Sequence, residues 1–483
     1  MERSAMDNSS TNNLHVVMLS SPEAGHVVPI IALANRLAEQ HHVRSTVLLV
    51  TTGAPSESKL MNPPRERGLV EIIWLPPVDI SNLVDPSTKM MTQMCLMMRE
   101  AVPLVRSAIA AMDRLPDALI VVYFGTDSLQ IAAEFNMPKF ILCTSTAWFL
   151  ALSVYFPILD EQIKGLFVDE TRHLKIPGCK PVRHEDAVDM MMDRDDQQYH
   201  EYLRIGRGLS LSDGILVNSC EDLEAKTLQA FTENDAMKSV CKSPVYPIGP
   251  LTRPVESTGL RSDLMDWLDK QPNHSVLFVS FGSGGVLSAE QTTELACGLE
   301  LSQQRFVWVI RPPKKGHVND AFFPDNIEGT EDDYLPEGFL NRTKNIGILV
   351  PTWGQQVEIL AHPSIGGFMS HCGWNSTLES IVSGVPMIAW PLYAEQRMNA
   401  TFLVEDLGVA VRPEVLPTKK VVGREEIEKM VRTLMEHKDG QGMRDRMMQL
   451  KTRATNGLNE GGSSHTSMRK ILSIIEAKKN ATN

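Results

Sequence analysis

Short runs of aliphatic and β-branched residues alternate with segments of helical periodicity along most of this 483-residue chain. In the first half, the runs expected to be strands are residues 14–19, 43–50, 70–75, 118–122 and 139–143. A second series follows at residues 275–280, 305–310, 346–350, 365–369 and 386–390. Strands that alternate with helices build parallel sheets from βαβ units, so the sequence predicts two doubly wound α/β domains.

The start of the first helix and a break in mid-chain define the predicted organisation. Pro29 is expected to be the first helical residue, a position where the missing amide hydrogen costs little. His26 then lies in the loop before this helix. Proline, glycine and serine are concentrated in residues 244–261, which we interpret as an interdomain linker. Ligands of doubly wound sheets bind beyond the carboxyl ends of the strands, so the loops there are the candidate sites.

Composition excludes several classes of protein. With 47 basic and 59 acidic residues the net charge is −12, which argues against nucleic acid as the main partner. Seven cysteines without C-x-x-C spacing fit neither a disulfide framework nor a zinc ribbon. Residues 1–13 are polar and lack the apolar core of a signal peptide. The uncharged residues 140–159 contain Pro157 and are interpreted as a buried strand and helix, not a membrane span. We therefore expect a cytoplasmic protein.

The loop HCGWNS at residues 371–376 favours the binding of a diphosphate. It lies between a predicted strand and a helix, where free amides and the side chains of His371, Asn375 and Ser376 can receive phosphate without a metal. The alternative is that Trp374 and His371 are core residues at the strand-to-helix junction. The glycine-rich residues 281–285 are a weaker signal, equally compatible with a plain turn.

Two further side chains in this region favour a nucleotide. Glu379 would repel phosphate, so a ribose hydroxyl is its better partner. The indole of Trp353 can stack on a planar base. The G-x-G-x-x-G fingerprint of nicotinamide-dependent oxidoreductases is absent.

Residues 353–396 resemble the donor-binding signature of the plant UDP-glycosyltransferases, inverting enzymes of the GT-B fold. The resemblance continues in HVVMLSSPEAGHVVPIIALANRLA near the start, in YPIGPL, WLDKQP and LPEGFL, and covers nearly the whole chain. FGTD and AWPLYAEQRMNA resemble the hydroquinone and monolignol glucosyltransferase branch. The resemblance implies an acceptor-binding domain over residues 1–250, a UDP-sugar-binding domain over 251–460, and a C-terminal helix within 461–483 that packs back on the first domain.

The resemblance also implies roles for individual residues. Trp353 would stack on uracil, and Glu379 would hold the ribose. The implied contacts to the rest of the donor come from Ser283, His371, Asn375 and Ser376 at the diphosphate, Trp374, Glu395 and Gln396 at the sugar, and Gly354 and Gln356 nearby. A glutamine at the last position of the signature is associated with glucose. We accordingly expect a monomer that uses UDP-glucose as co-substrate and a small aromatic acceptor, with no metal or other cofactor.

His26 is the predicted general base, because a largely neutral imidazole can take the proton of an acceptor hydroxyl. The family normally supplies an aspartate that hydrogen-bonds this histidine, and the matching position here is Val122. Tyr123 or Asp127 could replace it, although Asp127 is more naturally the cap of the next helix. From Val122 we expect a preference for acidic hydroxyls, that is, phenols over aliphatic alcohols.

Three alternatives to O-glucosylation by His26 remain, two of which follow from Val122. A polyhydroxylated aromatic ring could be glucosylated at carbon instead of oxygen. A protein without the aspartate could bind a UDP-sugar and transfer it weakly or not at all. Asp193-Arg194-Asp195 has the D-x-D form of metal-dependent glycosyltransferases of another fold.

Glu23, beside His26 in the sequence, is expected either to be solvated or to contact the acceptor.

Overall fold

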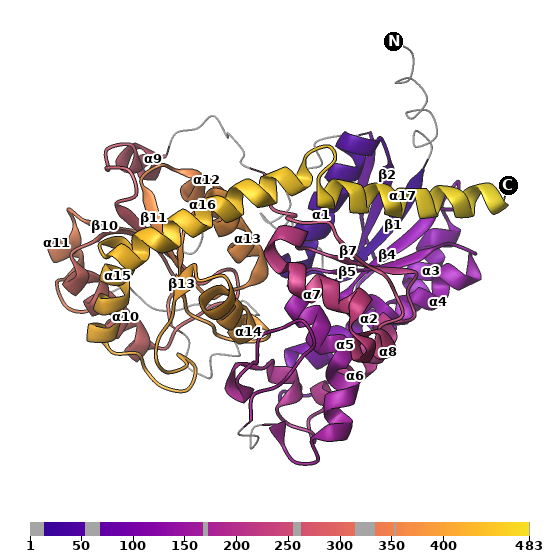
Figure 1. The fold of residues 1–483 in the computed structure, drawn as a ribbon, viewed down its shortest axis with the longest axis horizontal. Coiled ribbons are helices and arrows are strands. Elements are labelled where there is room, and N and C mark those ends of the chain that lie inside the picture. Colours follow the sequence, from indigo (N-terminus) through magenta and orange to yellow (C-terminus); the bar gives the residue numbers. More distant parts are fainter. Residues whose placement is uncertain are drawn as a thin grey trace, which may run out of the picture. The chain divides into compact units, whose positions relative to one another are not determined.

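The computed structural model describes residues 14–53, 68–167, 172–254, 262–313, 334–351 and 354–482. The chain divides into one unit of Met1–Thr252 with Asn456–Asn483 and a second unit of Arg253–Thr455. The chain therefore leaves the first unit, builds the second and returns to the first. Each unit contains a parallel β-sheet, as Figure 1 shows by the sequence colours.

The sheet of the first unit has the strand order β3-β2-β1-β4-β5-β6-β7. Its strands are β1 (His15–Ser20), β2 (Arg44–Leu49), β3 (Val70–Trp74), β4 (Ala118–Val122), β5 (Lys139–Cys143), β6 (Gly214–Val217) and β7 (Val245–Pro247). The central strands β1, β4 and β6 are buried along their whole length, as expected of a parallel sheet covered on both faces. The order reverses between β1 and β4, so the loops after these two strands flank the switch point where such sheets bind ligands.

The helices of the first unit connect these strands, and the last one comes from the far end of the chain. They are α1 (Ala24–His41), α2 (Met90–Glu100), α3 (Val102–Ala110), η2 (Tyr123–Ser128), α4 (Leu129–Glu134), α5 (Ala147–Gln162), η4 (His184–Asp186), η5 (Asp189–Met191), α6 (Gln197–Leu209), α7 (Glu221–Glu233), α8 (Asp235–Val240) and α17 (Ser463–Thr482). Helix α17, yellow in Figure 1, contacts β7, and the Ser464 hydroxyl donates to the Gly249 carbonyl at 2.6 Å.

The sheet of the second unit has the order β10-β9-β8-β11-β12-β13 and reverses between β8 and β11. Its strands are β8 (Val276–Ser280), β9 (Arg305–Ile310), β10 (Gly347–Pro351), β11 (Ile365–Ser370), β12 (Met387–Ala389) and β13 (Ala410–Val411). Its helices are α9 (Asp263–Leu268), α10 (Ala289–Ser302), α11 (Phe339–Thr343), α12 (Gln356–Ala361), α13 (Trp374–Ser383), α14 (Gln396–Thr401), η8 (Phe402–Asp406) and α15 (Arg424–Met435), and α16 (Lys438–Leu458) leads back to the first unit. A core that includes Leu277, Trp308 and Trp390 packs this sheet against its helices.

The ten strands predicted from the sequence are all present, with bounds that differ by at most a residue or two. Three strands were not predicted, namely β6, β7 and β13. The uncharged residues 140–159 form most of β5 and α5, as predicted. None of the helices described is both long and apolar enough to cross a membrane.

Two predictions about the chain's organisation are wrong in detail. Helix α1 begins at Ala24, so Pro29 lies inside the helix and His26 lies in its first turn instead of the preceding loop. Residues 244–261 are not all linker, because Val245–Pro247 form edge strand β7 and the Arg36 guanidinium holds the carbonyls of Ile248 and Pro250 at 2.6 and 2.8 Å. An edge strand tolerates proline, which explains why a proline-rich sequence can pair here. Residues 255–261 of the predicted linker lie outside the described residues.

Candidate functional site

His26 lies at the switch point of the first sheet, beyond the carboxyl end of β1. Its Nδ1 is 2.7 Å from the Ser21 hydroxyl, and its side chain is 14% exposed. The edge of the ring meets the ring of Phe124 at a centroid distance of 5.2 Å. Sequence reasoning did not identify Ser21 as a site residue, although a hydroxyl at the end of a central strand is well placed to orient a neighbouring histidine. When Nδ1 carries the proton and donates to Ser21, Nε2 is free to take a proton, which suits a general base.

Neither of the two side chains considered as substitutes for the missing aspartate supports His26. Val122 ends β4 and is fully buried. The Tyr123 hydroxyl donates to Ser153 at 2.9 Å inside the core, and burial raises the pKa of Tyr123 well above its ordinary value. Asp127 pairs with Arg204 at 2.6 Å and Arg99 at 3.4 Å.

The prediction that Asp127 caps a helix is also wrong. It lies inside the 3₁₀ helix η2, and the cap residue of the following helix α4 is Ser128, whose side chain makes no capping hydrogen bond. The two arginines that hold Asp127 also bind Glu201, so its carboxylate belongs to an ion-pair network of α2, η2 and α6.

Glu23 is the carboxylate closest in sequence to His26, and it turns towards the imidazole. Its Oε2 lies 3.6 Å from His26 Nδ1, although the side chain as a whole is 25% exposed. Glu23 is the N-cap residue of α1, and its side chain accepts no capping hydrogen bond. It is therefore not simply solvated, which was one of the two predicted roles.

In the second unit, the loops after β8 and β11 meet around His371. Gly282 has φ of +73°, and a Cβ on it would lie 2.4 Å from the His371 ring. Gly373 approaches the same ring equally closely, since a Cβ on it would lie 2.4 Å from Nε2. The glycines at these two positions are thus required by the close packing of backbone on the imidazole. Burial, with a contribution from Arg311, lowers the pKa of His371 to about 4, so its ring is neutral and can donate only one hydrogen bond.

Helix α13 starts directly after this loop with an N-terminus suited to an anion. Its cap residue, Gly373, makes no side-chain cap, and no acidic residue lies in the first turn. Asn375 and Ser376 lie in that turn, as predicted, and Ser376 is buried. The Trp374 ring is 3% exposed and packs 6.2 Å from Phe402, so the indole takes part in the core of the junction. A helix N-terminus without a side-chain cap carries a partial positive charge that favours a phosphate here.

Gln356 connects the two polar positions of α13 that the sequence assigned to different parts of the donor. Its amide nitrogen donates to Ser376 Oγ at 2.9 Å and to Glu379 Oε2 at 2.7 Å. Glu379 is 3% exposed, and burial raises the pKa of its carboxyl, against the opposing effects of Arg253 and of the Gln356 hydrogen bond. A buried carboxylate of this kind can accept hydrogen bonds from hydroxyl groups of a ligand.

The remaining predicted residues lie at the same edge of the second sheet or outside the described residues. Gln396 is buried, and its Oε1 accepts from the amides of Leu392 and Tyr393 at 3.0 and 3.1 Å. Any contact of Gln396 with a sugar must therefore come from its amide nitrogen. Glu395 is half-buried directly before α14, and Gly354 is half-buried two residues before α12. Trp353 lies outside the described residues.

Arg311 is a cation at this site that sequence reasoning missed. It follows β9 at the carboxyl edge, and its guanidinium donates to the carbonyl of Ser283, one of the predicted phosphate contacts. Burial lowers the pKa of Arg311, and the same charge helps to lower that of His371. The sequence signal was its place immediately after a predicted strand of the second series.

The predicted metal alternative does not assemble in the part of the chain that is described. Arg194 of the D-x-D sequence binds Asp160 at 2.5 Å, and its guanidinium lies over the rings of Phe167 and Tyr199. Over the described ranges, no three His, Cys, Asp or Glu side chains gather in a group that could hold a metal ion.

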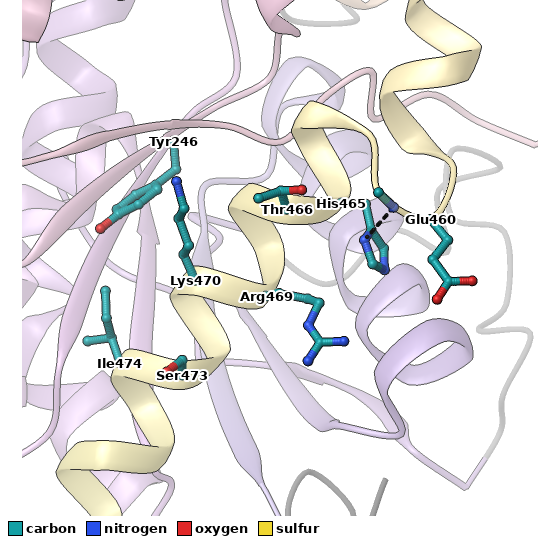
Figure 2. A pocket seen from close by; sticks show the side chains of 9 residues that line it. Tyr246, Glu460, His465, Thr466, Arg469, Lys470, Ser473 and Ile474 are labelled. Atoms are coloured by element: carbon teal, nitrogen blue, oxygen red, sulfur yellow. Dashed lines mark hydrogen bonds between the residues drawn. The ribbon is translucent and has the colours of Figure 1, made fainter. Parts of the chain in front are cut away.

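A cavity of about 730 Å³ lies elsewhere on the first unit, along α17. Figure 2 shows Lys470 beside Tyr246 of β7, with His465 and Arg469 further along the lining. The Gly461 amide donates to His465 Nδ1 at 3.4 Å. None of the lining residues is among those predicted to bind substrate, so this cavity is separate from the predicted site.

Comparison with known proteins covers both units. A family model described as "UDP-glucoronosyl and UDP-glucosyl transferase" matches residues 190–451. Anthocyanidin 3-O-glucosyltransferase 5 of Manihot esculenta is 49% identical over 94% of this chain and 94% of its own length. Hydroquinone glucosyltransferase of Rauvolfia serpentina is 41% identical over 97% of this chain and 99% of its own. The crystal structure of TcCGT1 in complex with UDP matches with a TM-score of 0.90 and 44% identity, over 96% of this chain and 100% of that chain.

Proposed function

We infer the reaction from the family: this chain belongs to the UDP-glucuronosyl and UDP-glucosyl transferases, has a GT-B fold and is a UDP-glycosyltransferase. We propose that it transfers glucose from UDP-glucose to the hydroxyl of a small phenolic acceptor, with inversion at the anomeric carbon. His26 acts as the general base, and no metal takes part.

The observation that carries this proposal is the 2.7 Å hydrogen bond between Nδ1 of His26 and the Ser21 hydroxyl, because Nε2 is free when Nδ1 is the donor. In the proposed step, Nε2 takes the proton of the acceptor hydroxyl, and the oxygen attacks C1 of the glucosyl group. The bond between C1 and the diphosphate oxygen breaks, and its electron pair leaves with UDP. A single displacement of this kind inverts the configuration at C1.

Support for the donor half comes from the second unit. The N-terminus of α13, neutral His371 and the Arg311 charge suit the diphosphate, whose negative charge grows as the C1–O bond breaks. Glu379, Gln356 and Ser376 suit the ribose and the adjoining phosphate. We assign Trp353 and Gly354 to the base, Ser283 and Asn375 to the diphosphate, and Trp374, Glu395 and Gln396 to the sugar.

Support for a phenolic acceptor comes from the relatives and from Val122. Anthocyanidin and hydroquinone, the acceptors in the names of two relatives, both carry phenolic hydroxyls. A phenol is far more acidic than an aliphatic alcohol, so it needs less help from a base that lacks an aspartate on β4.

The test is turnover of UDP-glucose with hydroquinone by the purified full chain, with the product identified by mass spectrometry. We expect His26→Ala to lower kcat by roughly 10²–10⁴-fold, which is the usual contribution of a general base. Binding of UDP-glucose, measured by calorimetry, should stay within about twofold of wild type, because His26 belongs to the first unit and the predicted donor contacts to the second. Full activity of His26→Ala would overturn the proposal.

C-glucosylation is a second candidate, and it agrees with a β4 that ends in Val122 and supplies no carboxylate. Without a carboxylate from β4, a phenolate formed in the site could react through an electron-rich ring carbon as well as through oxygen. A polyhydroxylated aromatic acceptor tests this, because a C-glucoside survives hot acid and an O-glucoside releases glucose.

A further inference from the structure

The carboxylate of Glu23 occupies an unusual place for a residue at the start of a helix. As the N-cap residue of α1 it directly precedes the first turn, yet its side chain accepts no capping hydrogen bond. Instead Oε2 is buried, without a hydrogen-bond partner, and lies 3.6 Å from Nδ1 of His26. A buried carboxylate oxygen without a donor is costly unless a positive charge compensates it.

We propose that Glu23 is a positioning residue for His26, which keeps the proton on Nδ1 and stabilises the imidazolium formed during transfer. This inference rests on the proposed function, because it assumes that His26 is the base. Strand β4 ends in Val122 and supplies no carboxylate to His26. In this proposal Glu23, in the loop before α1, supplies that negative charge instead.

A carboxylate is needed because the hydrogen bond between Ser21 and His26 does not determine which imidazole nitrogen carries the proton. A serine hydroxyl can donate to Nδ1 or accept from it, and the two cases leave opposite tautomers of the imidazole. If Nδ1 lacked its proton, Nε2 would carry one and could not act as a base. A negative charge 3.6 Å from Nδ1 favours the tautomer with Nδ1 protonated, in which Nε2 is free.

The position of His26 in α1 increases the importance of this charge. The imidazole lies in the first turn, where the helix dipole disfavours a cation. From η2, the group that faces the ring is Phe124, which carries no charge, while Asp127 of η2 is held by Arg99 and Arg204. Among the described residues, the ion-pair partner within 4 Å of His26 is Glu23.

The experiment compares Glu23→Gln with wild type and with Glu39→Gln. Gln keeps the shape of Glu23 and removes its charge, and Glu39 is an exposed acid on the same helix, so Glu39→Gln removes the same charge elsewhere. Rates are measured from pH 5 to 9 with UDP-glucose and a series of substituted phenols of graded acidity.

For Glu23→Gln we expect kcat to fall on the order of tenfold with the KM for UDP-glucose unchanged, since a charge partner of this kind acts on the base alone. The acidic limb of the kcat/KM profile should move to lower pH, and the loss should grow as the phenol becomes less acidic. If Glu23 had only a structural role, Glu23→Gln would neither shift the acidic limb of the kcat/KM profile nor make the loss depend on the acidity of the phenol.

Two outcomes separate this inference from the proposed function. If His26→Ala is inactive and Glu23→Gln behaves like Glu39→Gln, the role of Glu23 is refuted and the base remains. If His26→Ala is fully active, the proposed function itself fails. Circular dichroism and melting temperatures confirm that each variant is folded.

Discussion

At the residue scale, we expect the valine at the end of β4 to limit which acceptors His26 can activate. Val122 is fully buried beside the switch point and can neither accept a hydrogen bond nor carry charge. We expect Val122→Asp to raise the rate on a benzylic alcohol about tenfold relative to a matched phenol, because a charge-assisted hydrogen bond contributes roughly 1.5–3 kcal/mol. The measurement is the ratio of kcat/KM for the two acceptors. An unchanged ratio would refute the idea that Val122 restricts the enzyme to acidic hydroxyls.

Glu379 provides a second residue-scale prediction, on the pH dependence of donor binding. Burial raises the pKa of its carboxyl, so lowering the pH protonates Glu379 before ordinary surface acids of its type. A neutral carboxyl accepts a weaker hydrogen bond from a ribose hydroxyl than a carboxylate does. We therefore expect the affinity for UDP-glucose to fall about fivefold between pH 7.5 and 5, as the bond loses its charge assistance of about 1 kcal/mol.

Glu379→Gln is the matched variant for that titration. It should bind UDP-glucose more weakly at pH 7.5 and show little change with pH, because the titrating group is gone. Calorimetry without acceptor gives the dissociation constants. A wild-type affinity that does not vary with pH would contradict the proposed contact between Glu379 and the ribose.

At the scale of elements, the junction of β8, β11 and α13 depends on Gly282. Its φ is +73°, and a Cβ would lie 2.4 Å from the His371 ring. Gly461 has a φ of +81° with nothing within 4 Å of a Cβ, so Gly461→Ala carries the backbone strain without the collision. We expect Gly282→Ala to weaken UDP binding at least tenfold by displacing His371, and Gly461→Ala to leave it unchanged. Equal affinities of the two variants would show that the loop tolerates the side chain.

The elements that sequence reasoning found are those whose pattern is long and apolar. Strands β1, β4 and β8 are continuous aliphatic runs, and burial on both faces makes such runs unmistakable. Strand β7 was missed because Pro247 and the prolines on either side of it indicate a linker, and β13 was missed because two residues show no periodicity. The start of helix α1 was predicted too late, because Pro29 was expected at the first helical position and lies instead in the second turn.

The candidate site was predictable where a contiguous motif carries it, and not where contacts come from distant loops. The loop of His371 and the first turn of α13 follow one another in sequence, so their proximity was evident. The partners of His26 and the place of Arg311 depend on which way a side chain turns at a strand end. Burial and hydrogen-bond competition decide that direction, and one sequence does not report them.

At the scale of the whole molecule, residues far apart in the chain complete the first unit. Helix α17 buries Met468, Ile471, Leu472 and Ile475, and Lys479 pairs with Asp117 at 3.3 Å. The second unit is an insertion between Thr252 and Asn456, so each unit has its own sheet and its own core. Thermal unfolding should therefore report on the two units separately, with UDP stabilising the second.

This division leads to a prediction on stability against pH. Burial lowers the pKa of His15 and His41, in the first unit, and of His371, in the second, to about 4 each. Between about pH 6.5 and 4 the unfolded chain binds a proton at each position that the folded chain does not. The free energy of unfolding should fall as the pH drops through this window, by up to about 1.4 kcal/mol per pH unit for each histidine.

Scanning calorimetry from pH 7.5 to 4.5, with and without UDP, distinguishes the contributions. His15→Gln offers an amide to Thr46, which His15 Nε2 meets at 2.9 Å, and removes the titration. We expect this variant to reduce the pH dependence of the first unit's transition and to leave that of the second unchanged, because His15 lies in β1. His437→Gln, on an exposed histidine of the second unit, is the control and should change neither. If His15→Gln melts with the pH dependence of wild type, the neutral, buried state of His15 is not what makes the first unit sensitive to acid.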